Sequence, residues 1–422
     1  MDYSKLLQTV LDIAEEMLVA GAEVNRVEDS IERMISAYDC PFERVNVFII
    51  TTNIQTTFED PDGNIITQIR RIKRSDTNFD RLDYLNDLSR YICEHKPGLE
   101  EMRSRYLEVM NRPQHSLVVK YLSAALVSGT FTVFFGGSFF DGFCAFVIGA
   151  IIVFLQRYLR KFNENQLALT FTTAFISGMI TIILFSGGLA NMNYILIGQI
   201  MLLIPGLALT NSVRDMLLGD IATGSVRLLN ALVTAGAIGL GMAPPLALTR
   251  FFARLFSLEV SIPILSFGER TGMYLYIVQV LMAFMGTLGY ALMINTSRRQ
   301  SIMGGIGGAI TWTIYLLLHE MTGEYFFPTV IAAMFIGFYS EIMAKKNKAP
   351  ATIFITSASI VMVPGSALYY FVERLLDADY SEAFGYGRLA LGIAVAISIG
   401  LVFTAIIYRY YLKIRSGGAK NA

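Results

Sequence analysis

The sequence predicts an α-helical polytopic membrane protein, with about ten transmembrane helices arranged as two inverted five-helix repeats after a small α+β cytoplasmic domain. Three observations predict this fold class. Hydrophobic residues make up 54% of the chain and charged residues only 16%, whereas soluble domains carry about a quarter charged residues. Apolar segments long enough to cross a bilayer recur after residue 116, and one motif occurs twice within them.

The first 112 residues hold a large share of the charges and form the predicted cytoplasmic domain, 1–112. Near the N-terminus, apolar residues recur at helical spacing, which predicts two amphipathic helices broken near Gly21. The first hydrophobic stretch is interrupted by Asp12, Glu15 and Glu16 and lacks a basic leader region. We therefore expect a cytoplasmic, uncleaved N-terminus.

The middle of this domain has a strand pattern. Residues 44–58 are rich in β-branched and aromatic side chains, and residues 59–64 supply Pro, Asp, Gly and Asn for a turn. Residues 65–73 then resume the strand pattern, so we expect a β-hairpin. Helical patterns return over 78–94 and 98–110, which makes the domain α+β.

Ten apolar segments of about 18 to 25 residues follow, each long enough to cross a hydrocarbon core of roughly 30 Å. The expected spans are 116–136, 139–159, 167–187, 192–212, 226–248, 272–294, 302–320, 326–344, 350–371 and 387–412. Alternate connections carry the basic residues, as the positive-inside rule requires. These residues are Arg157, Arg160, Lys161, Arg214, Arg227, Arg298, Arg299, Lys345, Lys346 and Lys348. The pattern places both termini in the cytoplasm of a multi-pass plasma (inner) membrane protein.

The spans divide into a first five-span repeat, 113–249, and a second, 272–422, joined by a connecting segment, 250–271. That segment breaks the charge rule, because its arginines would fall outside the cell. A re-entrant or interfacial stretch there is an open alternative.

An internal repeat supports the inverted arrangement. The segment LLIPGLALTNSVRDMLLGDIATG, from Leu202, resembles IVMVPGSALYYFVERLLDADYSE, about 159 positions later. Both copies lie on the fourth span of a five-span half. Two similar halves with an odd number of spans enter the bilayer in opposite orientations, as in many secondary transporters. Chance similarity of two apolar stretches is the alternative, and the match extends into charged positions, for example from Asp220 to Asp379.

Each copy of the repeat contains a Pro–Gly pair within a span. Proline removes a backbone donor and loosens the helix, which frees polar backbone groups for a bound solute. The pairs and the polar residues that follow them are the substrate-binding candidates: Pro205, Gly206, Thr210, Asn211, Pro364, Gly365, Ser366 and Tyr369. A packing kink without a ligand is the alternative.

Four acids near these kinks are candidates for proton coupling or ion pairing, since ionisable groups at membrane depth are costly. They are Asp215, Glu373, Asp220 and Asp379. The first two adjoin an arginine, so interfacial salt bridges are an equal alternative. The last two lie further out, where helix capping is the alternative.

Several other classes of protein are disfavoured. The 34 basic residues balance 34 acidic ones, so a nucleic-acid partner is not expected. The isolated thiols Cys40, Cys93 and Cys144 and three scattered histidines predict no disulfide framework, metal site or cofactor. We find no nucleophile with a neighbouring base, so no catalytic residues are assigned.

The stretch GAEVNRVEDSIERM, residues 21–34, packs charges into about three helical turns. A strand-rich segment, the helix RSDTNFDRLDYLNDLSR and ten spans in two halves follow it. This order resembles the threonine/serine exporter (ThrE-type) family, in the form with both five-span units in one chain. The matching family markers are Gly21, Glu23, Arg26, Glu28 and Asp29. The resemblance implies secondary export and does not make the markers substrate ligands.

Three hypotheses follow from these observations. The first is an exporter of small hydrophilic amino acids, threonine or serine, driven by the proton motive force through alternating access. The second keeps that mechanism and exports a small dicarboxylate such as succinate, as the resemblance also allows. The third is a membrane-anchored regulatory or hydrolytic protein whose soluble domain is active. The partners expected for an exporter are a small-molecule substrate and the lipid bilayer, with a homo-oligomer allowed by small-residue helix faces.

Overall fold

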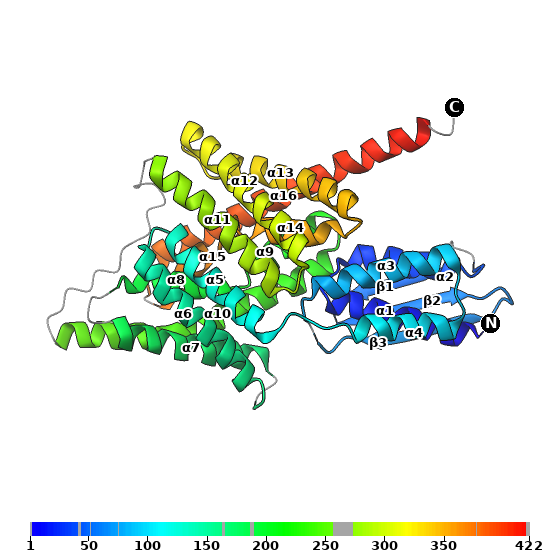
Figure 1. Cartoon of the computed structure of the whole chain (residues 1–422), viewed down its shortest axis with the longest axis horizontal. Coiled ribbons are helices and arrows are strands. Elements are labelled where there is room, and N and C mark those ends of the chain that lie inside the picture. The colour runs from blue at the N-terminus through cyan, green and yellow to red at the C-terminus, as the bar shows by residue number, and fades with distance from the viewer. Residues whose placement is uncertain are drawn as a thin grey trace. The chain divides into compact units, whose positions relative to one another are not determined.

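The structure of this protein is a computed structural model that describes residues 2–40, 44–50, 52–74, 76–162, 165–185, 190–255, 273–376 and 378–418. The chain divides into two compact units (Figure 1). Unit 1 comprises Met1–His115, Ile294–Arg298 and Ile342–Ile353. Unit 2 comprises Ser116–Met293, Arg299–Glu341 and Phe354–Ala422.

The helices of the first 115 residues pack around an apolar core. They are α1 (Tyr3–Val19), α2 (Val24–Ser36), α3 (Phe79–His95) and α4 (Leu99–Met110). The break between α1 and α2 lies at Gly21, as predicted, where the backbone has a φ of +105°. Glycine suits this position for two reasons: its φ is left-handed, and an added Cβ would lie 3.1 Å from the ring of Phe79.

The sheet of unit 1 has three antiparallel strands in the order β1 (Asn46–Ile50), β2 (Asn53–Glu59) and β3 (Ile65–Arg71). The predicted two-stranded hairpin was therefore wrong in its first strand. Ile50 pairs with Asn53, so the chain reverses within the stretch that was expected to be continuous. β-Branched residues continue through this reversal without Gly or Pro, and the side-chain pattern alone does not reveal it. The second predicted turn is present, because Glu59 pairs with Ile65.

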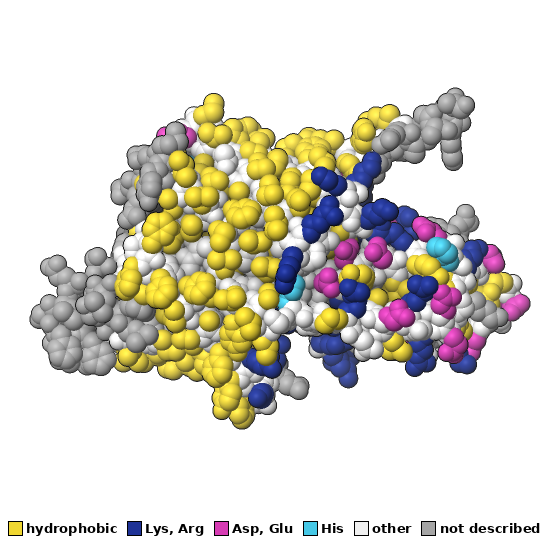
Figure 2. All heavy atoms as spheres, viewed as in Figure 1, with side chains coloured by type: hydrophobic (Ala, Val, Ile, Leu, Met, Phe, Trp, Pro, Cys, Tyr) yellow, Lys and Arg dark blue, Asp and Glu magenta, His cyan; other side chains and the backbone are white. Residues whose placement is uncertain are grey.

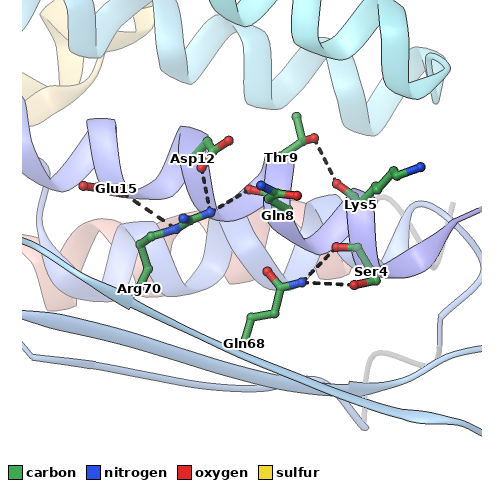
Figure 3. Close-up of polar contacts among 8 residues, drawn as sticks. All are labelled: Ser4, Lys5, Gln8, Thr9, Asp12, Glu15, Gln68 and Arg70. Atoms are coloured by element: carbon green, nitrogen blue, oxygen red, sulfur yellow. Dashed lines mark hydrogen bonds and ion pairs between the residues drawn. The ribbon is translucent and has the colours of Figure 1, made fainter.

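Helix α1 contacts strand β3 through polar side chains as well as through the core (Figure 3). The Arg70 guanidinium lies 2.7 Å from the Asp12 carboxylate and 3.9 Å from that of Glu15. Gln68 Nε2 donates to the Ser4 carbonyl at 2.9 Å. These contacts attach the charged side of α1 to the strand that faces it.

Unit 2 is built from helices. In the first half they are α5 (Leu117–Phe134), α6 (Phe139–Leu159), α7 (Gln166–Phe185), α8 (Met192–Leu203), α9 (Gly206–Leu217) and α10 (Ile221–Leu255). In the second half they are α11 (Met273–Met293), α12 (Arg298–Thr322), α13 (Phe326–Asn347), α14 (Ala351–Ser359), α15 (Gly365–Leu376) and α16 (Tyr380–Gly418). The order is the same in both halves: three long helices, a broken pair and a final long helix. The end of α13 and the start of α14 belong to unit 1.

The ten expected membrane spans are confirmed only in part. The described residues contain eight helices long and apolar enough to span a membrane, or nine if the bent pair α8–α9 counts as one span. The expected span 350–371 is divided between α14 and α15 by non-helical residues 360–364. Hydropathy averages over such a break and so does not detect it. Most of the expected connecting segment 250–271 lies outside the described residues, and α10 continues into it as far as Leu255.

The surfaces of the two units differ in composition (Figure 2). Hydrophobic side chains cover the face of unit 2 that is shown, whereas charged side chains gather on unit 1. Many of the exposed large hydrophobic residues lie on the long helices of unit 2, such as Phe143 on α6 and Leu281 on α11. A continuous apolar exterior over long helices is the surface expected of a bilayer-embedded protein. The chain is therefore a multi-pass membrane protein.

Candidate functional site

The two broken helices of unit 2 meet at their breaks. Helices α8 and α9 are bent by 49° around Pro205. A Cβ added at Gly206 would collide with the side chain of Val363, next to Pro364. A Cβ added at Gly365 would lie 3.3 Å from Cγ2 of Ile204, next to Pro205. Ile204 and Val363 occupy equivalent positions in the repeat, directly before the proline. The glycine of each break therefore packs against the residue that precedes the proline of the other break.

The same relation extends through unit 2. Helix α5 closely approaches α6 as α11 approaches α12, and α7 approaches α10 as α13 approaches α16. In each case a glycine removes the side chain that would separate the helices. The pairs are Gly149 with Ser128 and Gly308 with Thr287, then Gly241 with Ala174 and Gly400 with Ala333. Each glycine and its partner in the first half has an equivalent 159 positions later in the second half. The two halves therefore repeat their helix packing as well as their sequence.

The short helices that follow the breaks also end alike. Gly219 has a φ of +99° and Ala378, its equivalent, a φ of +59°. The Asp220 carboxylate then accepts from the Thr223 backbone N–H at 3.2 Å, and Asp379 accepts from that of Glu382 at 3.2 Å. These two acids therefore act as N-caps of α10 and α16, which is the capping alternative.

The substrate-binding candidates differ in their surroundings. Pro364, Gly365, Ser366 and Tyr369 are all buried, whereas Pro205 and Asn211 are half-buried. The buried Thr210 hydroxyl donates to the Gly206 carbonyl at 3.2 Å. This bond lies within the first turn of α9, so the Thr210 hydroxyl is used inside its own helix. The structure brings the two Pro–Gly pairs together.

A small cavity lies at the second break. Its volume is about 50 Å³, and its lining includes residues 361–363, Pro364, Ser366 and aromatic residues. The rings include those of Phe134, Trp312 and Tyr315. Small-molecule sites occupy roughly 300–1,000 Å³. The cavity is therefore smaller than a typical small-molecule site.

Buried charges lie at equivalent positions after the two breaks. Arg214 is 6% exposed and Glu373, its counterpart in the second half, is 5% exposed. The next residue in each half has the opposite charge, Asp215 after Arg214 and Arg374 after Glu373. Asp215 forms an ion pair with Arg227 at 2.5 Å, and Arg374 forms one with Glu382 at 3.1 Å. The ion-pair alternative thus holds for Asp215.

Two polar residues of this region were not singled out from the sequence. Gln199 is fully buried on α8, and its Nε2 donates to Thr181 Oγ1 at 2.6 Å, while its Oε1 has no partner among the described residues. Ser398 Oγ on α16 lies 3.1 Å from the Thr210 carbonyl on α9, across the two halves. An amide in the middle of an apolar helix was the available signal for Gln199. Nothing in the local sequence distinguishes Ser398 from a serine bonded within its own helix.

The family markers in unit 1 have structural contacts. The Glu23 carboxylate accepts from the Thr352 hydroxyl at 2.9 Å, and the Arg26 guanidinium donates to Asn86 Oδ1 at 2.9 Å. Asp29 forms an exposed ion pair with Arg33, and Glu28 is half-buried. Gly21 forms the turn described above. Within the described ranges, no group of three His, Cys, Asp or Glu side chains is placed to hold a metal ion.

Comparison with known proteins adds a family to this geometry. The ThrE family model, described as a threonine/serine exporter, matches residues 8–249. A second model, "Threonine/Serine exporter, ThrE", matches residues 279–407. These descriptions name a transporter and not an enzyme.

Two relatives carry the same description. The "Threonine/serine exporter" of Corynebacterium glutamicum is 22% identical over 403 residues, which cover 94% of this chain and 81% of the relative. The "Probable threonine/serine exporter" of Mycobacterium tuberculosis is 23% identical over 415 residues, covering 94% and 74%. An uncharacterized protein of Schizosaccharomyces pombe is 22% identical over 447 residues, covering 97% and 56%. No solved structure matches. The family models together extend over both halves of the chain, which therefore belongs to the threonine/serine exporter (ThrE) family.

Proposed function

We propose that this protein exports small hydrophilic amino acids, with threonine and serine as substrates, by secondary active transport. Two inverted five-span halves alternate their access to the two sides of the membrane around the crossing of the broken helices. The observation that carries the proposal is the reciprocal packing of Gly206 on Val363 and of Gly365 on Ile204. Broken helices at the interface of two repeats are where secondary transporters bind their solutes.

The charges beside the crossing favour a zwitterion. Arg214 and Glu373 offer one buried charge of each sign at equivalent positions, and an amino acid carries one charge of each sign. A dicarboxylate such as succinate requires two cations. Arg227 is already paired with Asp215, and Arg388 is exposed. Dicarboxylate export is therefore the second candidate, and it depends on Arg214 with one further cation.

Proton coupling is assigned to Glu373. Asp215 is held in its ion pair, and Asp220 and Asp379 are helix caps. Among the four candidates, Glu373 is the most deeply buried, with 5% of its surface exposed, and an ionisable group at membrane depth is costly to keep charged. Exchange of a proton for the amino acid then makes the transporter an antiporter driven by the proton motive force. The charge distribution of the connections favours a cytoplasmic location for both termini.

Efflux from whole cells tests this proposal. Cells producing the chain are preloaded with labelled threonine, serine or succinate, and the initial efflux rate is measured across external pH. We expect amino-acid efflux that depends on the proton gradient, with the pH dependence flattened in Glu373→Gln and retained in Asp215→Asn. A pH profile unchanged in both variants would reduce Glu373 to a structural group.

The same assay separates export from the anchor hypothesis. If unit 1 were the active part and the spans only an anchor, the full chain would export no solute. Efflux of succinate without efflux of threonine would instead select the dicarboxylate candidate.

A further inference from the structure

Unit 1 contains a pocket that the proposed transport route does not use. Its volume is about 250 Å³, just below the range of roughly 300–1,000 Å³ for small-molecule sites. Three segments line it: the start of α3 from Asn78 to Arg81, the linker after α4 from Val109 to His115, and residues 295–298. The first two belong to the N-terminal part of the chain and the third joins α11 to α12, but all three are parts of unit 1.

Hydrogen bonds hold the three walls together. Two backbone N–H groups at the start of α3 donate to the segment that precedes α12. Phe79 N–H donates to the Ile294 carbonyl at 3.1 Å, and Asp80 N–H donates to the Asn295 carbonyl at 2.9 Å. Nε2 of His115 lies 2.9 Å from the Thr296 carbonyl. The pocket is thus a built feature of unit 1 with fixed walls.

The charged groups of the pocket have both signs, with a cationic excess. Arg81 forms an ion pair with Glu16 at 3.2 Å, and the Arg112 guanidinium lies over the Tyr84 ring at 3.5 Å. Arg298 adds a further guanidinium to the lining. Guanidinium groups match the geometry of a carboxylate, which can accept two parallel hydrogen bonds.

An acidic group and a neutral acceptor complete the lining. Burial raises the pKa of the Asp80 carboxyl group, while the nearby Arg112 and His115 oppose this shift. Asn295 is 4% exposed, and within the described part of the chain its Oδ1 has no hydrogen-bond partner. A buried acceptor without a donor costs free energy unless a ligand or water supplies one. The Asn295 backbone has a φ of +55°, a conformation that asparagine tolerates better than most residues.

We propose that this pocket binds a free α-amino acid by its zwitterionic head group. The carboxylate lies against Arg112 and Arg298, and the ammonium group donates to Asn295 Oδ1 and the Asp80 carboxylate. An inorganic anion would satisfy the guanidinium groups but would leave the Asn295 acceptor unpaired and would face Asp80. The amino acid therefore uses the whole donor and acceptor set.

This site is distinct from the crossing of the broken helices, so its occupancy is a signal and not a transport step. The linker that carries Arg112 leads directly into α5, and residues 295–298 lead into α12. Binding restrains both connections at once. Unit 1 thereby senses the amino acid whose export the spans perform, and only this regulatory role rests on the proposed function.

Hydrogen–deuterium exchange on the full chain in lipid nanodiscs tests the pocket separately from transport. L-threonine, L-serine, succinate and inorganic phosphate are the probes. We expect threonine or serine to slow exchange in peptides covering 109–115 and 294–298. In Arg112→Gln the concentration for half-maximal protection should rise about tenfold, as expected for loss of a charged hydrogen bond. The matched control Arg103→Gln changes an exposed arginine of α4 that does not line the pocket, and should bind as the unmodified chain does.

A second variant covers the case in which Arg112→Gln disturbs folding. Asn295→Gly keeps the left-handed backbone accessible and removes the acceptor, so it should also weaken protection by amino acids. Equal protection by phosphate and threonine, or no protection by any amino acid, would overturn the proposal. So would unchanged binding in both variants. Protection in a chain that exports no amino acid would instead refute the transport proposal and leave the pocket assignment intact.

Discussion

The first and second halves of unit 2 use the same contacts to cross each other but surround the two breaks differently. At the first break only Ile204 and Pro205 lie between the helices, and both are half-buried. At the second, residues 360–364 are non-helical, buried and beside a cavity. Glycine contacts are therefore shared between the halves, while the polar and cavity-lining groups differ. This difference indicates a symmetric scaffold with an asymmetric site.

Substitution of the glycines where the two broken helices cross is expected to have the largest effect on transport, and a different effect in each half. A Cβ at Gly206 collides with Val363, whose β-branched side chain has few rotamers. A Cβ at Gly365 meets chiefly the flexible Met201 side chain, at 2.7 Å. We expect Gly206→Ala to lose most threonine efflux and about 1–3 kcal/mol of stability, the usual cost of overpacking, and Gly365→Ala to lose less. Efflux rates and thermal unfolding in detergent measure both effects.

A control variant and a rescue variant show whether the effect of Gly206→Ala comes from the crossing. Gly236→Ala on α10 is the matched control, because nothing lies within 4 Å of an added Cβ there. Adding Val363→Ala to Gly206→Ala should restore part of the lost efflux. Normal efflux by Gly206→Ala, or failure of Val363→Ala to restore lost efflux, would show that the crossing of the broken helices does not govern transport.

The prolines test which break carries the solute path. Pro205→Ala and Pro364→Ala each restore a backbone donor and allow more helix. We expect both to lower the initial efflux rate without preventing membrane insertion, and Pro364→Ala to have the larger effect because its surroundings are buried and line the cavity. Rates normalised to protein in the membrane measure this. Normal efflux by the double variant would remove the breaks from the proposed path.

The smallest expected effect concerns the bond between the halves from Ser398 to the Thr210 carbonyl. The same hydroxyl also lies 2.7 Å from the Ala394 carbonyl of its own helix, so its single proton is shared. Ser398→Ala should lower the free energy of unfolding by about 1 kcal/mol or less. Ser123→Ala, which removes a hydroxyl bonded within its own helix, is the control. A larger loss in the control would show that the bond between halves adds nothing.

Local patterns predicted much of unit 1 but not the number of its strands. The helix break at Gly21 follows from a residue type that tolerates a left-handed backbone, and the turn near residues 59–64 from its Pro, Asp and Gly. The reversal after Ile50 has no such residue, so the run was interpreted as one strand. The pocket of unit 1 was not predicted either, because its walls are about 180 residues apart in the chain.

By itself, the sequence determined that the chain is helical and apolar, that it contains two copies of one motif, and that Pro205 and Pro364 interrupt helices. These properties follow from composition, periodicity and the missing proline donor, which act within a few residues. Only the tertiary structure decided that the two breaks pack on each other, that Asp215 is paired while Asp220 and Asp379 cap helices, and that Gln199 is buried. Those outcomes depend on which helix faces meet, and long-range packing selects among faces that local patterns leave equivalent.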